Sequence, residues 1–444
     1  MHPDPEVKFP GSSVSFIFLN VDRIVLKHEK FEGMMMSRVL ICIIFFYLNA
    51  IHVLAQDGGM IYGKVTTFDD EVYIGHLRWG SEETFWTDHF NASKLDTRVF
   101  GHLIGQKKDE EGEEEGWLGI DWSLTSIWED RYGSVHEFVC EFGNIVSIEY
   151  IESRRILLRL KNGAVIKVGG SGYNDVRASV RMYDNEIGKI KIDGRRIWKV
   201  EFTNTPDRLE MKSGNPIYGS VITTQGDSIV GFIQWDHDER LDTEVLDGDS
   251  RGDDMSIPFK NISRIEARRN SSLVTLNSGR EFLLSGTNDV NHENDGIIVT
   301  VKGLGRIDIP WAQVEHVNFL HNIGHSGPIY SEFKKPNGLR GKVTSIEGSE
   351  YEGYIVYDMD EVWEFEMLDG YSKGLNFKIP FANIKSITPK NYNYSWVELK
   401  SGQRLLLGDS RDVSDKNDGL IIFEEKNAEP IKIRWSRIDQ ITFD

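Results

Sequence analysis

Two pairs of closely spaced carboxylates offer the clearest chemistry in this sequence. Asp236 and Asp238 follow one aromatic residue, and Asp358 and Asp360 follow another at the equivalent place 122 positions later. Paired carboxylates serve general acid and base catalysis, hold cations, or flank a glycosidic bond. We therefore expect these four residues to mark a surface that meets a ligand or partner.

A second group of carboxylates lies in two loops rich in Asp, Asn and Gly. Asp289 and Asp295 lie in the first loop, and Asp412 and Asp418 lie at matching places in the second. Oxygen-rich loops can bind Ca²⁺, so these four residues are candidate calcium ligands. Their spacing differs from that of the helix–loop–helix calcium motif, and the same residue types form tight turns. We favour the turn interpretation and expect no cofactor.

Established catalytic signatures are absent from the sequence. It contains no Gly-x-Ser-x-Gly, phosphate-binding loop, His-Glu-x-x-His or cysteine pair, and its twelve histidines fall singly. We therefore expect a protein that is not an enzyme. The alternative is a carbohydrate-active or calcium-dependent glycan-binding protein that uses the loop carboxylates, since two acids in a cleft suffice for glycoside hydrolysis.

The elements that position these loops recur three times. A glycine opens each stretch, a second glycine follows twelve residues later and an aromatic follows four after that, and a later Phe-x-Asn-Ile-x-x-Ile block completes the pattern. The opening glycines are Gly63, Gly219 and Gly341, and the blocks begin at Phe142, Phe259 and Phe381. Repeats of this length indicate one supersecondary unit that has been copied and stacked.

Each copy reads as short strands. In the second copy, an alternating, β-branched segment at 219–224 meets another at 228–235 across Gln225-Gly226-Asp227, which predicts a hairpin. The segment at 257–265 begins Ile-Pro-Phe, so we expect the strand to break there and one helical turn to follow. A second hairpin turns at Ser278-Gly279, and the matching turns are Asn162-Gly163 and Ser401-Gly402.

The two halves of each copy share an order of hairpin, further strand, Ile-Pro-aromatic and an Ile or Val pair. This pattern resembles SH3-like and Sm-like barrels, in which a 3₁₀ turn precedes the last strand. The resemblance implies an all-β fold of three tandem repeats, each made of two small barrel half-units. A six-bladed β-propeller is the alternative. The repeats span 56–205, 215–320 and 336–444.

The first copy carries an insertion at 106–135. It contains an acidic run at 109–116, which we interpret as a solvated loop, followed by Trp117, Trp122 and Trp128. Tryptophans in such a place either pack on the protein's own surface or contribute to a partner surface. Trp117 and Trp122 are therefore further candidates for that surface.

The N-terminal 55 residues predict export. Arg38 precedes a ten-residue apolar run at 39–48, and Val53-Leu54-Ala55 ends in small residues of the kind that a signal peptidase reads. We expect cleavage after Ala55 and translation from Met34, Met35 or Met36. No apolar stretch after Ala55 is long enough for a membrane span, and cleavage would leave Cys140 as the single cysteine.

The charge of the chain limits its partners. The formal net charge is −19, from 51 basic and 70 acidic residues. An acidic surface repels nucleic-acid phosphates and anionic membranes, so we expect neither as a partner. These features together predict a secreted or periplasmic, non-enzymatic binding or scaffold protein of the cell envelope, with a protein or glycan partner.

Overall fold

The computed structural model describes residues 59–95, 137–152, 154–170, 175–206, 214–321, 327–424 and 430–444. All of them belong to one compact unit, Ala55–Asp444. The predicted signal segment, the insertion at 106–135 and its tryptophans Trp117 and Trp122 lie outside the described residues.

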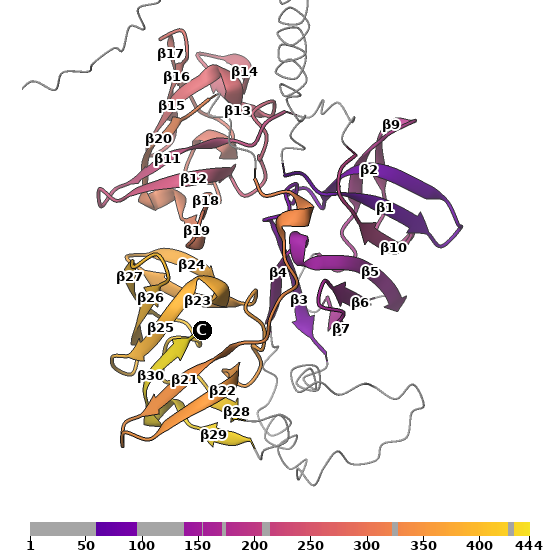
Figure 1. Ribbon diagram of the computed structural model, residues 1–444. Coiled ribbons are helices and arrows are strands. Elements are labelled where there is room, and N and C mark those ends of the chain that lie inside the picture. Colours follow the sequence, from indigo (N-terminus) through magenta and orange to yellow (C-terminus); the bar gives the residue numbers. More distant parts are fainter. Residues whose placement is uncertain are drawn as a thin grey trace, which may run out of the picture. The chain divides into compact units, whose positions relative to one another are not determined.

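The fold is all-β, as the sequence predicts, and every pair of neighbouring strands is antiparallel (Figure 1). The first set of strands comprises β1 (Tyr62–Thr67), β2 (Val72–Trp79), β3 (His89–Lys94), β4 (Glu137–Glu141), β5 (Ile145–Glu152), β6 (Arg155–Leu160), β7 (Val165–Gly169), β8 (Val180–Asp184), β9 (Gly188–Ile192) and β10 (Ile197–Phe202). The second comprises β11 (Tyr218–Thr223), β12 (Ser228–Trp235), β13 (Val245–Ser250), β14 (Asp253–Pro258), β15 (Ile262–Ala267), β16 (Ser272–Leu276), β17 (Glu281–Leu284), β18 (Ile297–Val301), β19 (Gly305–Ile309) and β20 (Val314–Phe319). The third comprises β21 (Arg340–Ser345), β22 (Glu350–Tyr357), β23 (Met367–Ser372), β24 (Leu375–Pro380), β25 (Ile384–Pro389), β26 (Tyr394–Leu399), β27 (Arg404–Gly408), β28 (Leu420–Phe423), β29 (Ile431–Ile433) and β30 (Ile438–Phe443).

Helical structure in the described residues is confined to single 3₁₀ turns, in agreement with the turn expected after Ile-Pro-Phe. These are η2 (Phe142–Asn144), η3 (Phe259–Asn261), η4 (Asn288–Val290), η5 (Trp311–Gln313), η6 (Tyr330–Glu332), η7 (Phe381–Asn383) and η8 (Trp435–Arg437). β14 and β24 end at Pro258 and Pro380, where the ring removes the donor that a ladder needs. The aromatic that follows each proline is buried and fills the core.

One pairing order recurs in all three sets. In the first set the strands run β4-β3-β7-β6-β5-β10-β1-β2-β8-β9. Adding twenty to each number gives the order of the third set. Adding ten gives the second, where the isolated bridge Asp249–Ser285 joins β13 to the residue that follows β17. In addition, β19 of the second set pairs with β24 of the third.

The half-units expected from the sequence are wrong in one respect, because the hairpins are exchanged between them. The hairpin β11–β12 pairs with β18 and β20, which the sequence assigns to the other half. The hairpin β16–β17 in turn pairs with β15. In the second set, β14, β13, β17, β16 and β15 form one group of five strands, and β20, β11, β12, β18 and β19 form the other. The two groups join through the pairing of β15 with β20, so neither returns to its own first strand. As a result, no sheet among the described strands closes into a barrel, and none stands apart as a propeller blade.

The buried side chains join the sets to one another. One core cluster contains residues of both the second and the third set, and these sets also share the β19–β24 pairing. A second cluster combines the first set with part of the third, including Val356, Trp363 and Phe365. The three sets are therefore packed together and are not independent beads.

Candidate functional site

The strands β12 and β22 each end in a tight turn that carries the predicted carboxylates. Asp236 and His237 have φ angles of 47° and 62°, and Asp358 and Met359 have 43° and 69°. Aspartate tolerates this left-handed conformation better than most residues. Trp235 and Tyr357 precede the two turns, and each forms an isolated bridge to the residue four positions later.

The structure brings the two groups of predicted carboxylates together. The Asp236 carboxylate accepts a hydrogen bond from the Asp295 backbone N–H at 2.6 Å and another from the Asn288 side chain. In the third set, Asp358 accepts from the Asp418 backbone N–H at 2.5 Å. These loops are far apart in sequence, and no local pattern linked them.

The carboxylates of the calcium candidates Asp289 and Asp412 accept backbone hydrogen bonds from β13 and β23. The Asp289 carboxylate accepts the backbone N–H of Asp247 at 2.7 Å, and Asp412 accepts that of Asp369 at the same distance. Asp175 does the same for Asn91 at 2.6 Å in the first set. A carboxylate that accepts a backbone donor stabilises the loop, and the hydrogen bond offsets part of the cost of burying the carboxylate.

The backbone carbonyls of Asp289 and Asp412 each accept a hydrogen bond from the aromatic residue that ends the preceding long strand. Trp235 Nε1 donates to the Asp289 carbonyl at 3.0 Å, and Tyr357 Oη donates to the Asp412 carbonyl at 2.6 Å. Asp418 pairs with Arg411. Within the described ranges, no group of three or more His, Cys, Asp and Glu is arranged to hold a metal ion. The contacts of these loops are those of turns.

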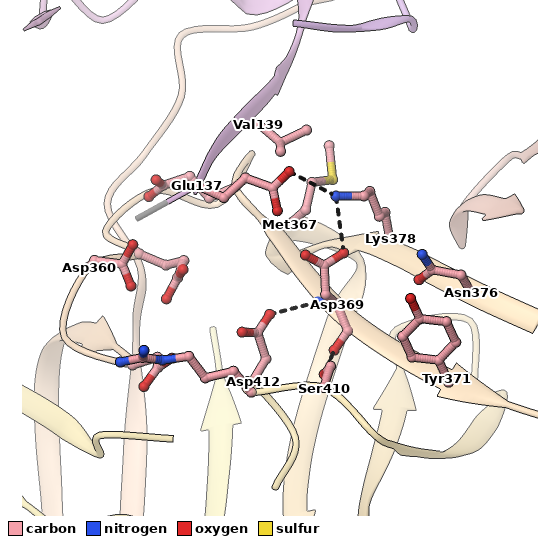
Figure 2. A pocket seen from close by; sticks show the side chains of 14 residues that line it. Glu137, Val139, Asp360, Met367, Asp369, Tyr371, Asn376, Lys378, Ser410 and Asp412 are labelled. Carbon is pink, nitrogen blue, oxygen red and sulfur yellow. Dashed lines mark hydrogen bonds and ion pairs between the residues drawn. The ribbon is translucent and has the colours of Figure 1, made fainter. Parts of the chain in front are cut away.

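A cavity of about 380 Å³ lies beside these turns in the third set (Figure 2). Most of its lining is polar, and seven residues bear carboxyl groups whereas two are basic. The lining consists of Glu137, Val139, Asp358, Asp360, Glu361, Glu366, Met367, Asp369, Tyr371, Asn376, Lys378, Ser410, Arg411 and Asp412. Glu137 and Val139 belong to β4 of the first set, so two sets contribute to one cavity.

Lys378 connects the two sides of this cavity. Its ammonium group lies 3.3 Å from a Glu137 carboxylate oxygen and 3.4 Å from one of Asp369, and Figure 2 shows it between the two. Arg411 pairs with Asp358 at 2.6 Å. These cations balance part of the negative charge and fix the positions of the carboxylates.

A third cation, Lys94 of β3, contacts the lining residues Asp360 and Glu366. Its Nζ atom lies 2.6 Å from Glu366 and 3.2 Å from Asp360, and its side chain is 3% exposed. Burial disfavours the ammonium form, but Asp360 and Glu366 outweigh burial and raise the pKa of Lys94. Lys94 is therefore charged, and it holds the first set against the third.

Burial changes the acidity of the pocket carboxylates. It raises the pKa of Asp358 to about 7, although Arg411 opposes the shift. Burial also raises the pKa values of Glu361 and Asp412 well above the ordinary range and raises that of Asp369. These four carboxyl groups therefore keep a proton to higher pH than exposed acids do, as expected of acids crowded in a poorly solvated space.

Four buried side-chain oxygens of the lining receive no hydrogen bond from the protein. Oε1 of Glu366 forms an ion pair with Lys94 and Oδ1 of Asp369 forms one with Lys378. The other two are Oε2 of Glu361 and Oδ1 of Asn376. Tyr371 of β23 lies opposite Asn376 of β24, is 41% exposed and offers an aromatic ring beside Asn376 (Figure 2). A ligand with N–H or O–H donors would satisfy the Asn376 oxygen, and its hydroxyl groups would pair with the neutral carboxyl group that the raised pKa of Glu361 favours. Buried polar atoms without partners are costly.

The predicted site residues divide between the cavity and its supports. Asp358, Asp360 and Asp412 line it. Asp236, Asp238, Asp289 and Asp295 belong to the corresponding loops of the second set. Sequence reasoning missed Glu361 and Glu366, although Glu239 and Glu244 stand at the same places in the second set and this recurrence was a usable signal.

No protein-family model, curated protein or solved structure matches the chain. The described residues also include no helix whose length and apolar character would suit a membrane crossing. The function of the chain must therefore be inferred from the cavity itself.

Proposed function

We propose that the chain is a secreted, non-enzymatic binding protein of the cell envelope, which takes an amino-group-bearing glycan in the acidic cavity of the third set. The observation that carries the proposal is the composition of that cavity. Carboxyl groups outnumber basic groups, and Glu361 and Asn376 present buried polar oxygens without hydrogen-bond partners in the protein. The amino and hydroxyl groups of a sugar supply the partners that these atoms lack.

Two further features favour a sugar over a small cation. The cavity volume of about 380 Å³ lies in the range of sites for small organic ligands. Tyr371 gives one wall an exposed aromatic ring, which packs well against the C–H face of a pyranose. The expected export of the chain would bring it to envelope glycans, and the repeated sheets would then serve as its scaffold.

The relationship to SH3-like barrels belongs to the same proposal. Each five-strand order, such as β4-β3-β7-β6-β5, has the size of such a unit. A 3₁₀ turn directly precedes β5, β15, β20, β25 and β30, the last strands in chain order of five of these groups, and an ordinary turn precedes β10. We infer that one pair of such units, with exchanged hairpins, was copied to give the three tandem sets. On this view the loops at the ends of the long hairpins diverged to form the site.

Titration calorimetry with three oligosaccharides of equal length tests the function. Oligomers of glucosamine, N-acetylglucosamine and galacturonate carry positive, neutral and negative charge. We expect the order of affinity to follow that charge, with the glucosamine oligomer bound most tightly. Absence of binding by all three, or tighter binding of the galacturonate oligomer, would show the proposal to be wrong.

A matched pair of substitutions assigns the binding to the cavity. Asp369→Asn removes a lining carboxylate, whereas Asp247→Asn changes the equivalent residue of β13, outside the lining. We expect Asp369→Asn to weaken binding of the glucosamine oligomer about tenfold, as for loss of a charge-assisted hydrogen bond. Asp247→Asn should leave the affinity within about twofold.

A carbohydrate-active enzyme is the second candidate, and one observation favours it. Glu137 and Asp369 come from different sets of strands and meet in one cavity, as a pair of catalytic acids would. Incubation of each oligosaccharide with the protein, followed by mass spectrometry, separates the candidates. Shorter products that disappear in Glu137→Gln would support the enzyme, and binding without products supports the non-catalytic protein.

A further inference from the structure

The pairing of β19 with β24 shows how one set of strands accepts an edge of another. The two strands are antiparallel, with Arg306 opposite Lys378, Ile307 opposite Phe377 and Asp308 opposite Asn376. Ile307 and Phe377 are both buried. This contact joins the last-paired strand of the second set to the first-paired strand of the third.

The equivalent strands of the first and second sets are β9 and β14. Among the described residues β9 pairs only with β8, and β14 pairs only with β13. Each therefore keeps one edge without a strand partner. Unpaired edges present rows of backbone donors and acceptors that readily accept a further strand.

Placing β9 and β14 in the register of β19 and β24 produces complementary pairs. The aligned glycines Gly188 and Gly305 and the aligned prolines Pro258 and Pro380 define this register. It then sets Lys191 opposite Asp254, Ile190 opposite Met255 and Lys189 opposite Ser256. Opposite charges and apolar side chains that face each other across two strands stabilise their pairing.

The exposure of these residues agrees with an unfilled contact. Ile190 and Met255 are half-buried, whereas their counterparts Ile307 and Phe377 are buried in the formed pairing. Lys189 and Lys191 are exposed on β9, and Asp253 and Asp254 are exposed on β14. Lysines on an edge strand repel most other strands, but they favour an acidic one.

We propose that β9 of one molecule pairs antiparallel with β14 of a second copy of this chain. The complementary charges of β9 and β14, and the same contact between β19 and β24, identify a second copy as the partner. Because β9 and β14 are different surfaces, the contact is heterologous, and repeated addition forms rings or open chains. The proposal is independent of the glycan cavity, which β9 and β14 do not line.

Charge exchange tests the pairing in sedimentation experiments on the full chain at about 0.15 M salt. We expect the wild type to associate with increasing concentration, and Lys191→Glu or Asp254→Lys to weaken association about tenfold. The double variant should regain the wild-type constant within about threefold. A wild type that stays monomeric at about 100 µM, or a double variant no better than either single one, would overturn the proposal.

Cysteine cross-linking distinguishes a second copy from pairing within one molecule. In a Cys42→Ser background, Ile190→Cys and Met255→Cys are made in separate chains, which are then mixed and oxidised. Cys140 is buried and does not compete. Directly opposite residues of antiparallel strands lie within disulfide range. A disulfide-linked dimer that forms only on mixing is the expected result.

Ile190→Cys and Met255→Cys combined in one chain test the alternative, in which β9 pairs with β14 of its own molecule. Monomers that close an internal disulfide, with no linked dimers or higher species, would show that β9 accepts β14 of its own molecule and would overturn the proposal. Equal cross-linking to an unrelated acidic strand peptide would also overturn it, because the site would then be a general edge. Ser250→Cys, at the far end of β13, replaces Met255→Cys as the off-register control.

Discussion

Gly219 of β11 lies directly opposite Gly231 of β12, and the pairs Gly63–Gly75 and Gly341–Gly353 repeat this arrangement. A Cβ atom on Gly219 would lie 2.3 Å from the Asn318 carbonyl oxygen of β20. A Cβ atom on Gly231 would lie equally close to the Thr300 carbonyl oxygen of β18. The glycines therefore let strands approach the hairpin from both sides, so that it can join two halves of the sheet.

Gly231→Ala tests this close approach. The added methyl group would meet backbone atoms of β18, which cannot move aside as a flexible side chain can. We expect the free energy of unfolding to fall by about 2 kcal/mol or more, as for overpacking in a core. Urea denaturation measures the change. Val230→Ala, at an exposed neighbouring position, should change stability by less than about 0.5 kcal/mol. Equal effects of the two substitutions would contradict the interpretation.

The spacing of these glycines was readable from the sequence because a hairpin is local. Gly219 and Gly231 lie on neighbouring strands joined by one turn, and Phe259 begins a 3₁₀ turn next to its proline. The exchange of hairpins was not readable. The strands β16 and β17 alternate in the same way whichever half they complete, so their pattern predicts a hairpin but not its partner.

The cavity was only partly predictable for a related reason. Asp358 and Asp360 stood out because two aspartates recur after an aromatic in two copies. Glu137 and Lys378 meet across 241 positions of sequence, and neither belongs to a recognisable motif. Contacts of this kind depend on how the sets pack, which the strand pattern of one copy does not specify.

Lys94 provides a test of the contact between the first and third sets. Lys94→Met would leave Glu366 buried without its 2.6 Å ionic partner. Removal of one member of a buried ion pair costs about 3 to 5 kcal/mol. We expect a loss of this order in urea denaturation.

Lys64→Met is the matched control for Lys94. Lys64 pairs with Glu201 at the same 2.6 Å, but its side chain is 42% exposed. Solvent screens such a pair, and the change should stay within about 0.5 kcal/mol. Similar losses in the two variants would indicate that Lys94 is not enclosed between the sets.

The hydroxyl group of Tyr357 is expected to contribute modestly to stability. It donates to the Asp412 carbonyl at 2.6 Å, and that carbonyl also accepts from the Asn417 amide at 3.1 Å. Tyr357→Phe removes one hydrogen bond without leaving the carbonyl unpaired. We therefore predict a loss of about 1 kcal/mol, measured by thermal or urea unfolding. A loss above about 3 kcal/mol would mean that the hydroxyl holds more than this loop.

Asp236 should make stability depend on pH. Burial raises its pKa from 3.8 to about 6, so the folded protein binds a proton in this range more strongly than the unfolded chain does. The stability that this protonation contributes is present in acid and is lost as the pH rises from about 4 to about 6. Asp236→Asn removes the titrating group, so the difference in unfolding free energy between wild type and variant should change by about 1 to 2 kcal/mol across that window, to the disadvantage of the wild type. This is less than the full shift implies, because solvent screens a partly exposed group. Urea denaturation at intervals from pH 4 to 7 measures this change. Parallel profiles for wild type and Asp236→Asn would show that Asp236 keeps an ordinary pKa in the fold.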